Sequence, residues 1–267
     1  GKADEGFQLW PMRAPELENG IEVRRGEGVA LYGLSGSGKS FLLRCMAGLW
    51  SRSIMKSVMR RGQHDHAQGL VTVDLGRFPA AKLASNIQYI FQNNRGSVSL
   101  SDTLADDLAS LRQRALKNSL RLAASVPKSQ WAGTLKSQHV ERFIDTMIAE
   151  LWERLQIPAA PLRDRDRFKL SGLSLGMLRR YTLIRALIKL DLHTVWSSSA
   201  RENPFAGAPW QVRYKPRVLL ADEVSRGLDP DSLFELGRLI SDLKRSAKLS
   251  VVIVSHENSF TAALAER

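Results

Sequence analysis

Cysteine and long apolar segments are almost absent from this sequence. Its 267 residues include one cysteine, Cys45, so no disulfide can form within the chain, and a disulfide-stabilised secreted fold is excluded. No run of about 18 apolar residues occurs, which excludes a helix that spans a bilayer. No secretory signal sequence is apparent, so we expect a soluble, cytosolic chain in which Cys45 is buried as a small apolar side chain.

Acidic residues are scarce relative to basic ones. The chain has 27 Asp and Glu against 39 Lys and Arg, which gives a formal net charge of +12 and a pI near 10.2. This excess indicates an anionic partner, either a nucleotide, an anionic lipid headgroup or a nucleic acid; the alternative is a solvated basic surface. Hydrophobic residues at 43% and charged residues at 25% are typical of a globular protein.

The most specific motif lies between residues 33 and 40, where the sequence is GLSGSGKS. It fits the phosphate-loop pattern G-x-x-x-x-G-K-[ST] at every required position. The apolar run before it predicts a buried strand at 29–32, and the residues after it predict a helix at 41–47. This order of strand, loop and helix is the context that the motif requires.

The chemistry of this loop predicts a nucleoside triphosphate site. Its glycines permit backbone dihedrals that turn amide groups inward, and the helix N-terminus adds partial positive charge. Lys39 is expected to reach the β- and γ-phosphates, and the Ser40 hydroxyl to bind Mg²⁺. Trp10 is expected either to stack on the adenine ring or to fill the core. The predicted nucleotide-binding residues of the loop are Gly33, Leu34, Ser35, Gly36, Ser37, Gly38, Lys39, Ser40 and Phe41.

Apolar periodicity predicts further strands and helices along the rest of the chain. Ser174 is the predicted N-cap of the helix that follows it. Two irregular stretches, 51–68 and 191–216, are expected to be exposed loops, and the two histidines of the first lack the further ligands of a metal site. We expect strands at 21–23, 69–76, 87–91, 218–221 and 251–254, and helices at 103–124, 139–156, from 174 onwards and around 233–243.

Polar residues follow three of the predicted apolar strands. The phosphate loop follows the first, Asp222 and Glu223 follow the strand at 218–221, and His256 lies just after the strand at 251–254. In a parallel α/β sheet these strand ends lie together at one crevice. Asp222 is then able to bind the Mg²⁺ that the loop serine also holds, and Glu223 to orient and deprotonate an attacking water.

Gln92 directly follows the strand at 87–91 and is expected to contact the metal or the water. His256 is expected to hydrogen-bond the γ-phosphate. With these residues in place, the chain resembles the nucleotide-binding domain of ATP-binding cassette (ABC) transporters over residues 7–260. The family's motifs occur in order: Trp10 at the adenine-stacking loop, Gly33–Ser40 at Walker A, Gln92 at the Q-loop, Leu173–Met177 at the signature, Asp222 and Glu223 at Walker B, Gly227–Asp229 at the D-loop and His256 at the switch histidine.

The resemblance implies an α/β fold: a P-loop NTPase (RecA-like) core with a mostly parallel sheet, a small antiparallel β part and a helical subdomain. It implies one domain over 1–267, with the core at about 1–92 and 178–267, the helical subdomain at about 93–177 and a surface insertion at 191–216.

The resemblance also assigns roles to single residues. Glu223, His256 and Gln92 are implied in catalysis, and Gln92 joins Ser40 and Asp222 as a metal ligand. Ser174, Gly176 and Asp229 are implied to contact nucleotide, the first two by reaching the γ-phosphate that a second copy binds.

The implied function is that of an ATP-hydrolysing subunit which uses ATP and Mg²⁺ and drives a separate integral membrane permease. It would act as a homodimer, or as a heterodimer with a second ABC subunit, on the cytoplasmic face of the cell membrane. Residues 90–97, IFQNNRGS, are similar to cassettes of oligopeptide, dipeptide and nickel importers. The alternative is a non-transport ABC ATPase acting on ribosomes or DNA, although such proteins usually carry two cassettes, and nucleic acid is not the expected partner.

The chain also departs from the family pattern. Leu175 stands where the family usually has glycine and adds bulk where the backbone approaches the γ-phosphate of the opposite subunit's nucleotide. After Walker B, the residues at 224–226 are Val-Ser-Arg in place of the usual Pro-Thr-Ser. Nucleotide binding is therefore the firmer expectation, and hydrolysis depends on how these positions are accommodated.

Overall fold

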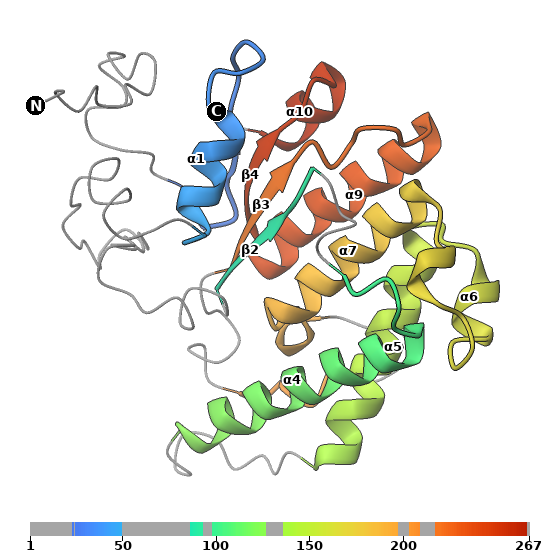
Figure 1. The fold of residues 1–267 in the computed structure, drawn as a ribbon. Helices are drawn as coiled ribbons and strands as arrows, with labels where there is room; N and C mark the ends of the chain where they lie inside the picture. The colour runs from blue at the N-terminus through green and yellow to red at the C-terminus, as the bar shows by residue number, and fades with distance from the viewer. Residues whose placement is uncertain are drawn as a thin grey trace, which may run out of the picture.

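The computed structural model describes residues 23, 25–49, 86–92, 98–126, 136–196, 203–208 and 217–265. Within these ranges a four-stranded sheet lies at the centre, with the strand order β1-β4-β3-β2 (Figure 1). Every neighbouring pair runs parallel, so the carboxyl ends of the strands lie at one edge, and the predicted parallel α/β sheet is confirmed. The strands are β1 (Gly28–Ala30), β2 (Ile87–Ile90), β3 (Val218–Asp222) and β4 (Ser250–Val254).

Some predicted parts lie outside the described residues. The antiparallel β part depended on strands at 21–23 and 69–76, of which only Val23 is described. Trp10 and the loop at 51–68 also fall outside. These expectations therefore stay predictions.

Both faces of the sheet are covered, because its two central strands, β3 and β4, are apolar at nearly every position. Side chains alternate between the faces along a strand. Leu220 and Val252 therefore face α1 (Lys39–Met46), where they pack with Leu43. Cys45, also on α1, is fully buried, as predicted. The larger core, on the opposite face, contains Leu219, Ala221, Val251 and Ile253.

A layer of helices lies on that opposite face (Figure 1). Helix α7 packs against β2, and α4 and α5 pack against each other and against α7. The start of α4 is fixed by a capping box in which Thr103 and Asp106 bond each other's backbone amides, at 3.2 and 3.3 Å. None of the helices in the described ranges is long and apolar enough to cross a bilayer. This layer consists of α4 (Leu104–Ala124), α5 (Ser137–Arg154), the short α6 (Ala159–Arg163) and α7 (Leu175–Lys189).

The first strand packs against α10 (Asn258–Leu264), which in turn packs against α9 (Pro230–Ala247). Gly28 of β1 lies so close to the end of α10 that a Cβ atom there would stand 1.8 Å from the carbonyl oxygen of Leu264. The same carbonyl accepts a hydrogen bond from Lys244 of α9. Only glycine fits at position 28, because any side chain would push α10 off the sheet.

The expectation that 191–216 is a surface insertion is wrong for the residues that the structure describes there, 191–196 and 203–208. Trp196 is 6% exposed and Phe205 is fully buried, and both belong to the larger core. The Trp196 indole N–H donates to Glu150 of α5 at 2.7 Å. Three serines and three prolines give this segment the look of a loop in the sequence, but a few large apolar side chains decide where it packs.

Candidate nucleotide site

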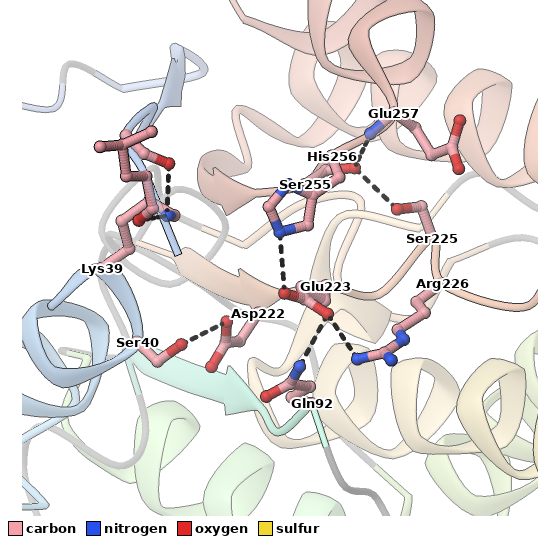
Figure 2. A network of polar contacts seen from close by, with 12 residues as sticks. Lys39, Ser40, Gln92, Asp222, Glu223, Ser225, Arg226, Ser255, His256 and Glu257 are labelled. Carbon is pink, nitrogen blue, oxygen red and sulfur yellow. Dashed lines mark hydrogen bonds and ion pairs between the residues drawn. The ribbon is translucent and has the colours of Figure 1, made fainter. Parts of the chain in front are cut away.

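The phosphate loop runs from the end of β1 into α1, as the motif predicted. Gly36 (φ 80°) and Gly38 (φ 89°) adopt left-handed backbone conformations, and Gly38 is the N-cap of α1. The Lys39 ammonium donates to the carbonyl oxygens of Gly33 and Leu34, at 2.7 and 2.8 Å (Figure 2). Lys39 is therefore bonded to two carbonyls of its own loop. A polyphosphate that binds there would compete with these carbonyls for the positive charge of the ammonium group.

Ser40 and Asp222 come together beside this loop, although 182 positions separate them. The Ser40 hydroxyl donates to Asp222 Oδ1 at 3.0 Å, and Asp222 is fully buried at the end of β3 (Figure 2). A hydroxyl and a carboxylate are the hard oxygen ligands that Mg²⁺ prefers, so this pair fits the predicted metal. The described ranges contain no group of three or more His, Cys, Asp and Glu that could hold a metal ion. An ion held here would complete its shell with phosphate oxygens and water.

Tyr89 is a residue of this site that the sequence analysis missed. Its hydroxyl donates to Asp222 Oδ2 at 2.6 Å. Burial, followed by the hydrogen bond to Asp222, raises the pKa of the Tyr89 phenol above its ordinary value. No sequence pattern marks this tyrosine, because its role depends on the register between β2 and β3.

Glu223 lies just past the end of β3, at the centre of a second cluster of polar side chains. Gln92 donates to its Oε2 at 2.7 Å, and His256 Nε2 lies 3.3 Å from its Oε1 (Figure 2). The predicted trio is thus brought together at one carboxylate. Gln92 directs its amide nitrogen to this carboxylate, so its predicted role as a metal ligand remains a prediction.

The backbone explains why two adjacent acidic residues serve different clusters. Glu223 has φ 50°, a left-handed conformation that is uncommon for a residue with a side chain, and its amide donates to Val254 of β4 at 2.8 Å. The chain turns sharply there, so Asp222 faces the phosphate loop while Glu223 faces Gln92 and His256. One carboxylate is thus available for a metal and the other for a proton.

Arg226 is a second residue that the sequence analysis did not assign to the site. Its guanidinium lies 3.2 Å from Glu223 Oε2, the same oxygen that Gln92 contacts. Close by, the hydroxyls of Ser225 and Ser255 lie 2.7 Å apart and tie the loops after β3 and β4 together (Figure 2). In the sequence, Arg226 is marked only by the departure from the family's Pro-Thr-Ser at 224–226. Spacing alone does not indicate which carboxylate this arginine contacts.

The signature and D-loop residues are engaged in helix caps. Ser174 caps α7, as predicted, by accepting from the Met177 amide at 3.2 Å. Asp229 caps α9 by accepting from the Ser232 amide at 2.9 Å. Gly176 faces the D-loop, since a Cβ atom there would lie 3.8 Å from Leu228 Cδ2. Helix α7 also lies on the opposite side of the sheet from α1 (Figure 1).

Comparisons with known proteins agree with this geometry. A methionine import ATP-binding protein (MetN) of Clostridium tetani is 24% identical over 248 residues, which cover 90% of this chain and 57% of the relative. A phosphonates import ATP-binding protein (PhnC) of Stutzerimonas stutzeri is 28% identical over 240 residues, with 89% and 68% covered. The chain therefore spans between about half and two thirds of the length of the relatives it matches.

Solved structures show the same fold. The dimeric structure of MJ0796, a bacterial ABC transporter cassette, matches with a TM-score of 0.53 at 18% identity and covers 91% of this chain and 80% of the other. The structure of cbiO1 from Clostridium perfringens matches with a TM-score of 0.50 at 19% identity, with 89% and 70% covered. The family model described as ABC transporter matches residues 19–191, well over half of the 267 residues. The chain therefore belongs to the ABC transporter family.

Proposed function

We propose that this chain binds and hydrolyses ATP and thereby powers transport through a separate integral membrane permease. One observation carries the proposal: the phosphate loop, the Ser40–Asp222 pair and the Glu223 cluster lie at the same edge of a parallel sheet. Relatives named as import ATP-binding proteins support it. The location that follows is the cytoplasmic face of the cell membrane.

ATP binding begins at the loop. Backbone amides of the loop and the N-terminus of α1 would hold the phosphates, and Lys39 would leave its two carbonyl partners to bind the β- and γ-phosphates. Ser40 and Asp222 would hold Mg²⁺, which, when bound, neutralises charge on the β- and γ-oxygens. Trp10 remains the predicted partner of the adenine ring.

Hydrolysis depends on the second cluster. Glu223 would orient the attacking water and take its proton as general base. Gln92 fixes one carboxylate oxygen from the end of β2. The His256 side chain is 64% exposed, so it can turn from Glu223 towards a γ-phosphate without unpacking the core. The three side chains come from three different strand ends, and each therefore has a rigid base.

A complete site is proposed to need two cassettes. Ser174 and Gly176 start a helix on the other side of the sheet from α1, and Leu175 between them is 46% exposed, so the signature is available to a second copy. Asp229 lies beside this surface at the start of α9. The dimeric MJ0796 cassettes support such an arrangement. The partner in this proposal is a second copy of the chain or a second ABC subunit.

The cargo is set by the permease and not by this fold. The relatives are named for methionine and phosphonates, whereas the sequence at 90–97 resembles cassettes of peptide and nickel importers. The finer resemblance therefore stays a prediction.

Hydrolysis is tested with purified protein, ATP and Mg²⁺. Glu223→Gln should bind ATP normally and hydrolyse it about 10²- to 10⁴-fold more slowly, the usual range for a positioned base. Wild-type turnover in this variant would remove Glu223 from the proposal. Co-purification with an integral membrane protein supports the transport function, whereas co-purification with ribosomal RNA or DNA supports the non-transport alternative.

A further inference from the structure

Tyr89 reaches the buried carboxylate of Asp222 because of the register between two strands. On β2, Tyr89 pairs with Leu220 of β3, and Asp222 lies two residues further along β3. Residues two apart on a strand share a face, and this is the face that α1 covers. The phenol therefore lies under the helix that follows the phosphate loop, where its hydroxyl meets Asp222 at 2.6 Å.

The two oxygens of Asp222 have different hydroxyl partners. Ser40 donates to Oδ1 at 3.0 Å, and Tyr89 donates to Oδ2 at 2.6 Å. One hydrogen bond would leave the carboxylate able to rotate about its Cβ–Cγ bond, whereas two bonds from opposite sides fix its plane. The ring of Tyr89 is itself held by Phe91, with the two ring centroids 4.6 Å apart in an edge-on arrangement.

We propose that Tyr89 is a positioning residue for Mg²⁺: it orients the Asp222 carboxylate so that Oδ1 faces the ion that Ser40 also holds. The proposal rests on the proposed function, since it concerns the metal of bound Mg-ATP. Carboxylates that bind metals are commonly oriented by an outer hydrogen bond, and loss of such a bond costs about 10- to 100-fold in metal affinity. The effect should therefore appear in the metal dependence of ATP binding and not in ATP binding itself.

The test compares the full chain with Tyr89→Phe, which removes only the hydroxyl, and with Tyr181→Phe as a matched control. Tyr181 of α7 also donates to a carboxylate, that of Asp107 in α4, but it lies in the helical layer. ATP dissociation constants are measured by calorimetry in EDTA and in excess Mg²⁺. The dissociation constant in EDTA divided by that in Mg²⁺ reports how strongly the protein couples the metal to the nucleotide.

We expect Tyr89→Phe to reduce this ratio at least tenfold, the lower end of the range for an outer hydrogen bond to a metal ligand, with the constant in EDTA unchanged. The control should keep the wild-type ratio. The double variant Asp222→Asn/Tyr89→Phe should lose no more than Asp222→Asn alone, because the phenol acts through the carboxylate. This comparison remains informative even if Tyr89→Phe lowers the melting temperature.

Two results would overturn the inference: an unchanged ratio in Tyr89→Phe, or an equal loss of ATP affinity in EDTA and in Mg²⁺. Failure of the proposed function looks different, because it appears in the wild type: that chain would then bind no ATP under either condition, or would bind it without hydrolysis.

Discussion

Arg226 and Glu223 form an ion pair of 3.2 Å between a guanidinium that is 66% exposed and a carboxylate that is 14% exposed. Gln92 donates to the same oxygen, so Oε2 of the proposed base carries two partners. A surface ion pair typically contributes no more than about 1 kcal/mol, so Arg226 can leave at little cost. Arg226 therefore holds the Glu223 carboxylate only weakly.

Replacing Arg226 with serine should increase ATP turnover. We expect Arg226→Ser to raise kcat by up to about fivefold, which corresponds to the about 1 kcal/mol that the ion pair contributes, because Oε2 regains an acceptor position for the attacking water. KM should stay the same, since Arg226 contacts the base and not the phosphate loop. Steady-state kinetics of Arg226→Ser and of the charge-preserving control Arg226→Lys measure the effect. A lower kcat in the serine variant would show that the arginine assists the base.

Removing the loop lysine should abolish ATP binding but not the fold. Lys39→Ala deletes a side chain whose bonds, at 2.7 and 2.8 Å, are to exposed loop carbonyls, so the melting temperature without ligand should change little. The rise in melting temperature with Mg-ATP should disappear, because only a ligand that binds the folded state stabilises it. Lys117→Ala, on an exposed part of α4, is the control and should respond to Mg-ATP like the wild type. Full stabilisation of Lys39→Ala would refute the assignment of the loop.

Two defective variants should restore each other if the site is shared between copies. Lys39→Ala removes the phosphate contact, and Ser174→Arg blocks the signature, so each alone should be inactive while a mixture forms one intact site per mixed dimer. ATP turnover of the mixture is compared with that of each variant at the same total concentration. Specific activity of the wild type should also rise with protein concentration. Concentration-independent turnover by a demonstrated monomer would contradict the shared site.

The described part of 191–216 should contribute to stability. Phe205 is fully buried and meets His193 edge-on, with ring centroids 5.6 Å apart, so Phe205→Ala should lower the free energy of unfolding by about 3 to 5 kcal/mol. Phe234 is 65% exposed on α9, and Phe234→Ala should change it by less than about 0.5 kcal/mol. Urea denaturation measures both. Equal, small effects would restore the expectation of a surface insertion.

The order of motifs along the chain was sufficient to predict the parallel sheet, the helices and much of the site. These features depend on local chemistry. Gly38 and Ser174 act within one turn of their own helices, and apolar runs of four or five residues form strands wherever they can be covered on both faces. The convergence of Asp222, Glu223 and His256 followed from one general property, that parallel strands end at the same edge of a sheet.

Contacts between distant elements were decided only by the tertiary structure. Tyr89 contacts Asp222 because of the register of β2 on β3, and Trp196 donates to Glu150 because its segment packs into the larger core beside α5. Phe205 belongs to the core because the fold provides a buried position for its ring, although its neighbours in the sequence resemble a surface loop. Composition and periodicity describe a residue's own segment, whereas these three roles depend on which partner the fold brings within a few ångströms.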